Sequence, residues 1–219
     1  DKSQYLFDGE WINFEVYDSA INVKLLKLFN INVKTDIRWS KHGPVLKLKH
    51  GVYAIRYAAM DEIRQIDQWF KMNKATTFED WESAIKLRYI PSLNCMYADN
   101  MGNISYIYNA AFPKRNSNYD WKEYLPGDTS ESLWTQLEEY KYLPKIHNPE
   151  SGFLQNCNST PFKTTDGPDN PDPDFFPDKL GIEMFMTNRA LRAIEMFGSD
   201  PVISQKDIFK YKFDMKYSE

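Results

Sequence analysis

The side chains in this sequence that could do acid–base or metal chemistry are three histidines and a run of aspartates. The histidines are His42, His50 and His147, and they show no spacing typical of metal ligands. The sequence contains no Gly-x-Ser-x-Gly nucleophile elbow, phosphate-binding loop or zinc signature. Surface or turn positions are therefore the simpler interpretation of all three histidines.

The aspartates gather in one stretch that is also rich in proline and hardly suits regular structure. They are Asp166, Asp169, Asp172, Asp174 and Asp178. Their carboxylates could coordinate Ca²⁺, which prefers hard oxygen ligands. A solvated loop is the alternative interpretation, and the residues alone leave both open.

The cysteines, Cys95 and Cys157, have neither the CxxC nor the Cys/His spacing of a redox or metal site. Two thiols suit a cytosolic and a periplasmic protein equally well. They therefore indicate no cellular compartment.

The composition excludes two classes of partner. With 219 residues, 42% of them hydrophobic and 16% aromatic, the chain can bury a core and favours β-rich or mixed packing. The net charge is −4 with interspersed signs, so we expect no nucleic-acid partner. The mean hydropathy is −0.62, and no stretch approaches the roughly 18 apolar residues of a membrane span.

Residues 1–56 predict an antiparallel β-subdomain. Asp8-Gly9 lies between two β-like runs, and this dipeptide supplies the positive φ that a tight hairpin turn needs. Further β-like runs cover residues 20–28, 30–37, 45–48 and 52–57. Asn30 and the pair Gly43-Pro44 punctuate them.

Residues 57–219 predict helices together with a hairpin. Ile63, Ile66 and Phe70 fall on one helical face. Thr77 to Asp80 resembles a capping box, which opens a helix that buries its apolar residues and ends before Pro91. The apolar residues of that helix are Trp81, Ala84 and Ile85. Strands are expected over 93–98 and 104–111.

The rest of this region is expected to be loop-rich from residue 113 to 149, apart from a short helical stretch around 133–139. Another strand is expected over 152–158. A closing helix would place its apolar residues on one face, and Ser204 to Asp207 opens a last short helix by the same capping logic. Those apolar residues are Ala190, Leu191, Ile194 and Phe197.

Several of these segments resemble the motifs of the penicillin acylase family, in the same order. Residues 94–106 (NCMYADNMGNISY) resemble its N-x-x-YAD-x-x-GNI-x-Y hairpin. Downstream, LPG at 125–127, Trp134, LP at 143–144, NPESGF at 148–153 and NCNS at 156–159 follow the family's run. Upstream, RWSKHGPV at 38–45 and FEDW at 78–81 also match. The resemblance therefore spans nearly the whole chain.

The resemblance implies an α+β fold, part of the αββα sandwich of N-terminal-nucleophile hydrolases, with the β-subdomain near the N-terminus. Residues 57–219 would then belong to the sandwich core with peripheral loops and helices. In that family an N-terminal Ser attacks an amide and its own α-amine acts as general base. Because the chain begins with Asp1, we expect an internal fragment of the large subunit that lacks the nucleophile and is inactive alone.

The resemblance also implies roles for four residues. Asn158 matches the oxyanion-hole Asn, and Arg189 matches an Arg that organises the site and aids processing. Asp178 matches a Ca²⁺-ligating Asp, and Trp121 a residue that donates a backbone carbonyl to the ion. Calcium is thus implied for the full-length protein, although no cofactor is required for the chemistry. Cys157 and Ser159 depart from the family's usual N-W-N-N run, which puts the floor of the acyl pocket in doubt.

The implied activity is hydrolysis of an amide of the β-lactam or acyl-homoserine-lactone type. The implied partners are that small molecule, the small subunit and the remainder of the large subunit, and the implied location is the periplasm or the exterior. The alternative is a degenerate non-catalytic homologue or a ligand-binding module that uses the aromatic-rich β-subdomain. The codons upstream of Asp1 would discriminate between the two.

Overall fold

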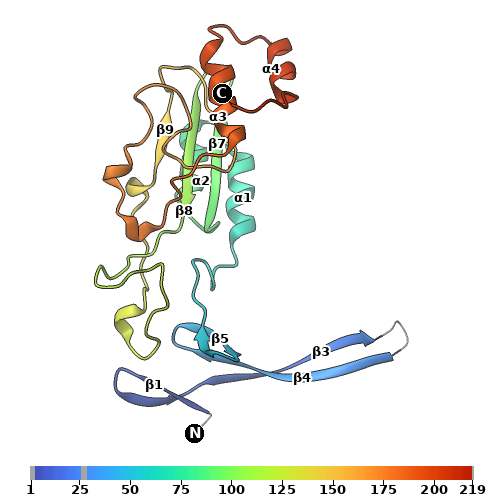
Figure 1. Cartoon of the computed structure of the whole chain (residues 1–219), viewed down its shortest axis with the longest axis vertical. Helices are drawn as coiled ribbons and strands as arrows, with labels where there is room; N and C mark the ends of the chain where they lie inside the picture. The colour runs from blue at the N-terminus through green and yellow to red at the C-terminus, as the bar shows by residue number, and fades with distance from the viewer. Residues whose placement is uncertain (1–2, 26–28, 219) are drawn as a thin grey trace. The chain divides into compact units, whose positions relative to one another are not determined.

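The computed structural model of the chain describes residues 3–25 and 29–218. The polypeptide divides into two compact units, which are drawn together in Figure 1. The first unit comprises Asp1–Met60 with Lys114–Gln136, and the second comprises Asp61–Pro113 with Leu137–Glu219. Each unit is described by itself below.

The first unit begins with the hairpin that the sequence predicts. Strand β1 (Gln4–Phe7) pairs antiparallel with β2 (Glu10–Asn13). Asp8 and Gly9 have φ values of 49° and 84°, so both turn residues are in the left-handed region that such a two-residue turn requires. The Asp8-Gly9 prediction is confirmed.

A four-stranded antiparallel sheet follows, in the order β3-β4-β5-β6. Its strands are β3 (Glu15–Leu25), β4 (Phe29–Ser40), β5 (Gly43–Leu48) and β6 (Gly51–Ala54). The first three predicted β-runs are therefore confirmed, although residues 26–28 of the first lie outside the described residues, and the fourth, predicted over 52–57, ends at Ala54. β5 pairs with β4 only at Arg38, Trp39 and Ser40, so most of β3 and β4 forms a two-stranded ribbon.

The turn between β4 and β5 explains the His-Gly-Pro segment in structural terms. Gly43 has φ 135°, and a Cβ there would lie 2.1 Å from the Ile55 carbonyl oxygen, so only glycine fits. His42 is buried, and its ring meets that of Phe7 edge-on at 5.9 Å. His42 thus packs inside the turn.

Residues 114–136 belong to the first unit, although residues 61–113 of the second unit separate them in sequence from residues 1–60. The Asp8 amide donates to the Asp128 carbonyl at 2.8 Å, and the Arg56 guanidinium lies 4.5 Å over the Trp134 ring.

The helix predicted around 133–139 is wrong. The backbone there pairs instead with the segment before it, as in Glu138 N–H to the Phe112 carbonyl at 2.7 Å, which an α-helix cannot do.

The second unit is built on a three-stranded antiparallel sheet in the order β7-β8-β9. The strands are β7 (Ser92–Ala98), β8 (Ile104–Ala110) and β9 (Lys145–His147). Helices α1 (Gln65–Lys74) and α2 (Phe78–Ile85) cover one face. The predicted hairpin at 93–111 and the capped helix at 78 are confirmed, with the Asp80 amide donating to Thr77 Oγ1 at 3.1 Å.

Between helix and sheet lies a core of Trp81, Ile85, Cys95 and Ile107. The apolar face expected for α1 is wrong: Ile63 precedes the helix, and Ile66 and Phe70 are 81% and 60% exposed. α1 instead packs through Gln68, which has no exposed surface and whose Oε1 accepts the Ile90 amide at 2.8 Å. A buried polar side chain with its own backbone partner has taken the position expected for an aliphatic one.

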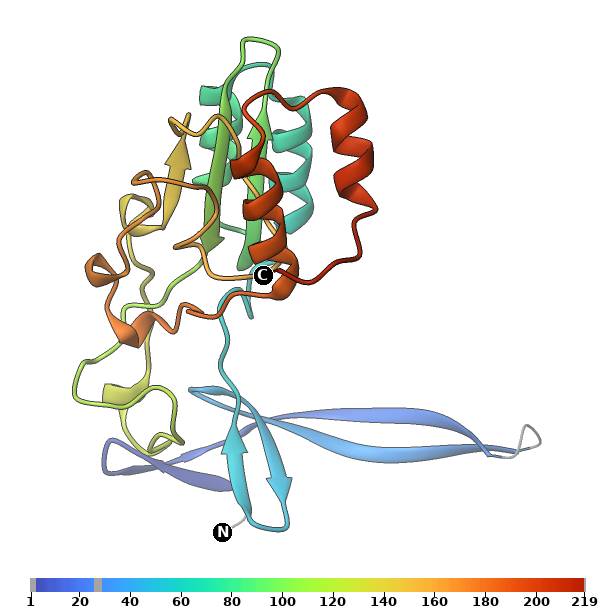
Figure 2. The same ribbon diagram turned by 45° about the horizontal axis from the view of Figure 1, so that its top comes forward.

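The other face of this sheet carries a long irregular segment, residues 148–187, followed by α3 (Asn188–Ser199) and α4 (Gln205–Lys212). Figure 2 shows α3 and the helix pair α1–α2 on opposite sides of β7 and β8. The Ser204–Asp207 capping box is present as predicted. α3 buries its alanines, Ala190 and Ala193, whereas Leu191 of the predicted face is 40% exposed.

These elements confirm the α+β class with an antiparallel β-subdomain at the N-terminal end. Among the described residues, none of the helices has the length and apolar character needed to cross a membrane.

Candidate active site

The segment that contains Asn158 is a compact loop, not a strand. The Gln155 amide donates to the Thr164 carbonyl at 2.7 Å, and Gln155 Nε2 donates to the Lys163 carbonyl at 2.8 Å. Thr165 Oγ1 donates to the Phe153 carbonyl at 2.8 Å. Backbone and side-chain hydrogen bonds within the loop therefore hold its two arms together.

The strand predicted over 152–158 is wrong for a backbone reason. Gly152 and Asn158 have φ values of 73° and 53°, which no extended strand accommodates. The hydrogen bonds within the loop replace those of a sheet ladder.

Asn158 is held in its left-handed conformation by the residue two positions before it. The Asn158 amide donates to Asn156 Oδ1 at 3.2 Å, which makes an Asx turn. Asn tolerates a positive φ better than most residues because its short side chain bonds locally. The Asn158 side chain is exposed, and within residues 3–25 and 29–218 it donates to no protein acceptor. Its amide is therefore free to meet a ligand.

A chain of hydrogen bonds connects this turn to the β7–β8 hairpin. Asn94 Nδ2 of β7 donates to the same Asn156 Oδ1 at 3.1 Å. Tyr106 of β8 donates its hydroxyl hydrogen to Asn94 Oδ1 at 3.0 Å. Tyr106 has no exposed surface, so the rigid sheet determines where the Asn158 turn lies.

Burial favours the protonated state that this chain of bonds needs. Loss of hydration around Tyr106 raises the pKa of its phenol, so the hydroxyl remains a donor at neutral pH. On the opposite face of the sheet, burial raises the pKa of the Cys95 thiol to about 12. Cys95 is therefore a core side chain and no nucleophile at neutral pH.

The structure brings Arg189 to the same loop. Arg189, in the first turn of α3, donates from Nη2 to the Cys157 carbonyl at 3.4 Å. Thr187, the N-cap of α3, donates from Oγ1 to that carbonyl at 3.3 Å. The peptide directly before Asn158 is thus held from α3, while Asn156 holds its amide.

This arrangement offers a neutral amide donor with a guanidinium close by. Such groups suit the stabilisation of a negative charge that develops on an oxygen. In the second unit, His147 ends β9 and lies against the Phe78 ring, with 4.4 Å between the ring centroids, on the helix side of the sheet. The loop therefore presents donors of the kind that a developing oxyanion needs.

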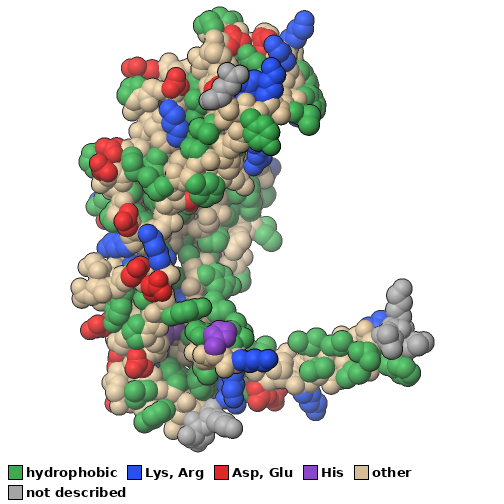
Figure 3. All heavy atoms as spheres, viewed as in Figure 1, with side chains coloured by type: hydrophobic (Ala, Val, Ile, Leu, Met, Phe, Trp, Pro, Cys, Tyr) green, Lys and Arg blue, Asp and Glu red, His purple; other side chains and the backbone are tan. Residues whose placement is uncertain are grey.

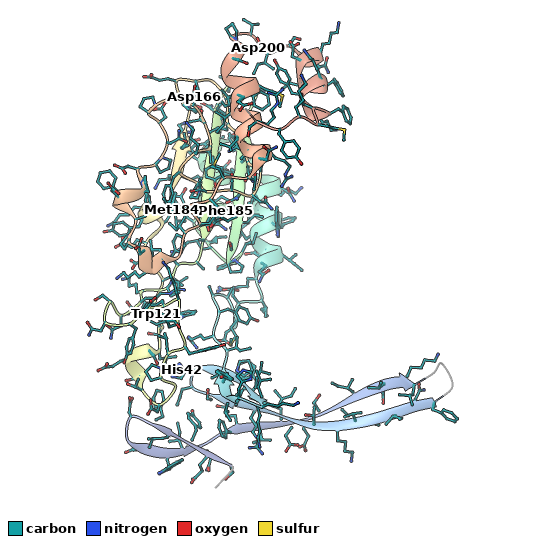
Figure 4. The ribbon with its side chains drawn as sticks, viewed as in Figure 1. His42, Trp121, Asp166, Met184, Phe185 and Asp200 are labelled. Atoms are coloured by element: carbon teal, nitrogen blue, oxygen red, sulfur yellow. The ribbon has the colours of Figure 1, made fainter. Side chains whose placement is uncertain are left out.

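The two residues that the resemblance assigns to calcium belong to different units. Asp178 is exposed on a single 3₁₀ turn of the second unit, and Trp121 belongs to the first, where its Nε1 donates to the Asn116 carbonyl at 2.7 Å. Two carboxylates of the acidic stretch accept backbone amides: Asp169 that of Glu150 at 2.8 Å and Asp172 that of Asp174 at 3.0 Å, while Asp166 lies 3.7 Å from Lys163 Nζ. Among the described residues, no group of three or more His, Cys, Asp or Glu could hold a metal ion. These residues do not by themselves fit Ca²⁺. Figure 4 labels Trp121 of the first unit and Asp166 of the acidic stretch in the second unit.

Sequence reasoning did not single out the residues that position Asn158. Asn94 and Asn156 lie in the motifs quoted above, where the repeated asparagines were the available signal, and Thr187 lies two residues before Arg189. Another motif residue has a structural role. Asn148 Oδ1 accepts the Ile104 amide at 2.8 Å, which joins the start of β8 to the residue that follows β9.

Comparisons with known proteins identify the relatives of this chain. The family model described as penicillin amidase matches residues 1–218. Penicillin G acylase from Escherichia coli is 30% identical over 165 residues, which cover 73% of this chain and 19% of that protein. The acyl-homoserine lactone acylase PvdQ from Pseudomonas fluorescens (strain Pf0-1) is 25% identical over 121 residues, 52% of this chain and 16% of that protein.

A solved structure gives the same fold. The thermostable penicillin G acylase from Alcaligenes faecalis superposes with a TM-score of 0.77 at 23% identity, covering 96% of this chain and 36% of the other. The chain thus spans about a fifth of the length of the curated relatives it matches. With the model matching almost end to end, the chain belongs to the penicillin amidase family.

Proposed function

We propose that this chain forms the oxyanion-stabilising part of a hydrolase that cleaves an acyl group from an amine through an acyl-enzyme. The observation that carries the proposal is the Asn158 turn: an exposed amide, fixed by Asn156 and flanked by Arg189. The names of the relatives, penicillin G acylase and acyl-homoserine lactone acylase, support a linear amide of the β-lactam or homoserine-lactone type as substrate.

Asn158 would donate from its side-chain N–H₂ to the oxygen of the tetrahedral intermediate. A neutral amide suits this position, because it stabilises the developing charge without gripping the ground state as a cation would. Arg189 and Thr187 would act on the substrate only indirectly, by holding the Cys157 carbonyl and so the orientation of the Asn158 backbone.

We place the nucleophile and its base in another part of a longer protein. The chain covers 19% of the E. coli relative and 36% of the A. faecalis chain, so most of the length of such enzymes is available to supply them. By this proposal the 219 residues alone hydrolyse no amide. Turnover of a chromogenic acyl-anilide by the purified chain, above a blank, would refute that part.

The test of the oxyanion role is Asn158→Ala in the full-length, processed enzyme. We expect kcat to fall about a hundredfold or more, in line with a lost donor of about 2.7–4 kcal/mol, while KM changes much less. The exposed side chain contributes little to the core, so the fold should persist. Asn118→Ala, at an exposed asparagine of the first unit, is the matched control. A correctly processed Asn158→Ala enzyme that kept most of its kcat would overturn the assignment.

One observation favours the alternative of a ligand-binding module. The first unit contains a hollow of about 770 Å³ lined by Tyr5, Phe14, Ile37 and Leu46 among others. Saturable binding of an aromatic acid there, in a full-length protein without amidase activity, would support that alternative over the enzyme. We further propose export to the periplasm or exterior, which cell fractionation of the full-length protein would test.

A further inference from the structure

The β3–β4 ribbon of the first unit has one mainly apolar face. Directly opposed residues share a face, and on this face, from Tyr17 and Ile37 to the end of the ribbon, the register pairs apolar with apolar, except where Ser19 opposes Thr35. The apolar side chains are Tyr17, Ile21, Val23, Leu25, Phe29, Ile31, Val33 and Ile37. Each is between 40% and 64% exposed, and Figure 3 shows them as a green band along the ribbon.

The opposite face of the same ribbon is polar. Its residues between positions 18 and 36 are Asp18, Ala20, Asn22, Lys24, Asn30, Asn32, Lys34 and Asp36. Only Ala20 interrupts this polar character. Because side chains alternate between faces with period two, such a pattern is typical of a strand pair that is buried on one side and solvated on the other.

The described residues leave the apolar face of the ribbon exposed. β3 is the edge strand of its sheet, and β4 pairs with β5 only at Arg38, Trp39 and Ser40. Nine residues, from Tyr17 to Leu25, at about 3.3 Å each give a mainly apolar strip roughly 30 Å long, and two strands give about 10 Å of width. That strip, about 300 Å², is at the size where exposed patches on monomers mark contact surfaces. A two-stranded ribbon is also marginally stable in water unless something packs on it.

We infer that this apolar face is a docking surface for another segment of the same, longer polypeptide. The inference rests on the proposal above that the chain is part of such a polypeptide. The fold match covers 96% of this chain but only 36% of the solved relative, so nearly two thirds of that relative's length is available to supply a covering layer. A tethered segment also has a high effective concentration, which a second copy lacks.

The charges of the ribbon argue against a membrane as the occupant. Its polar face carries Lys24 and Lys34 but also Asp18 and Asp36. Surfaces that bind anionic lipid carry an excess of Lys and Arg around the apolar side. The balanced charges suit a solvent-facing side of a protein layer.

The test compares two neighbouring small residues on opposite faces, Ser19→Cys and Ala20→Cys, in the full-length protein. Each variant reacts with a charged maleimide under native conditions and again in urea, and peptide mass spectrometry separates the introduced thiol from Cys95 and Cys157. We expect the native rate, normalised to urea, to be at least tenfold lower for Ser19→Cys than for Ala20→Cys, in protein that sediments as a single copy.

Three outcomes would overturn the inference. Equal normalised rates would mean that the face is open. Protection of Ser19→Cys only at concentrations where the protein dimerises would make a second copy the occupant. Protection only after adding phosphatidylcholine–phosphatidylglycerol vesicles would make it a lipid surface.

The proposed catalytic role and the docking inference are tested by different measurements. Acyl-anilide turnover and its loss in Asn158→Ala report the catalytic role, whereas labelling reports the ribbon. An open reading frame that encodes only these 219 residues would remove the shared premise and overturn the docking inference directly.

Discussion

Asn156→Ala should lower catalysis although Asn156 touches no substrate in our proposal. Its Oδ1 accepts two hydrogen bonds, from the Asn158 amide at 3.2 Å and from Asn94 Nδ2 at 3.1 Å. Alanine removes both. Asn158 then loses the turn that holds its φ at 53°, and the loop loses its connection to Tyr106 in the core of the sheet.

The magnitude follows from the bond that acts on Asn158. A typical intramolecular hydrogen bond contributes a net of about 0.5–1.5 kcal/mol. If that free energy holds Asn158 in the productive conformation, its loss lowers the productive population, and hence kcat, about two- to tenfold. This effect is well below the hundredfold expected for Asn158→Ala, because the donor itself remains.

The assay is steady-state hydrolysis of an acyl-anilide by the full-length enzyme. It is run on Asn156→Ala, on Asn158→Ala and on the variant that carries both substitutions. If Asn156 acts only through Asn158, the double variant should equal Asn158→Ala alone to within about a factor of two. The matched control is Asn116→Ala, since Asn116 Oδ1 accepts the Asn118 amide at 3.0 Å in the same i to i+2 geometry, in the first unit. Control and wild-type kcat should agree.

Losses that multiply in the double variant would refute the reasoning, because they would show that Asn156 contributes independently of Asn158. Equal losses in Asn156→Ala and Asn116→Ala would also refute it, since a general loss of turn stability would then explain both.

Three further predictions concern stability and metal binding. Ile85→Ala should lower the free energy of unfolding by about 2–5 kcal/mol because Ile85 is fully buried, whereas Ile63→Ala, at a side chain 91% exposed, should change it by less than about 0.5 kcal/mol; urea titration of the full-length protein checks both. Burial lowers the pKa of His42 in the folded state, so the unfolded state binds its proton more readily and the free energy of unfolding should fall as the pH drops below about 6.5. In thermal melts between pH 7.5 and 5.5, His42→Gln should reduce that loss of stability. An unchanged pH profile in the variant would contradict the prediction. The 166–178 stretch should bind Ca²⁺ weakly at best in this chain, because Asp169 and Asp172 already accept backbone amides and a Pro-rich loop loses entropy on ordering. Calorimetry that found micromolar affinity would disprove this.

Local patterns predicted the elements that local physics governs. The Asp8-Gly9 turn, the β-runs, the capped starts of α2 and α4 and the hairpin at 93–111 all depend on neighbours within a few residues. Turn chemistry and capping act over that range, so a single sequence contains the necessary information.

The misplaced elements fail where distant partners compete for the backbone. Residues 133–139 pair with residues 112–114, and Gln155 pairs with Thr164, in place of the helix and strand that their local composition favours. Likewise Gln68 is buried on α1 because the Ile90 amide needs an acceptor, while Ile66 is left exposed. None of these partners is visible from the residues nearby.

By itself, the sequence determined the family, through ordered motifs, and with it Asn158 and Arg189 as candidates. Only the tertiary structure decided how the surroundings of Asn158 are built. Arg189 reaches the Cys157 carbonyl from the first turn of α3, and Asn94 of β7 reaches the Asn156 side chain across 62 residues of chain. Return of residues 114–136 to the first unit is a fact of the same kind. Motif order specifies which residues are present, but the direction of an amide in space depends on backbone conformation and on hydrogen bonds between distant segments, and these exist only once the chain has folded.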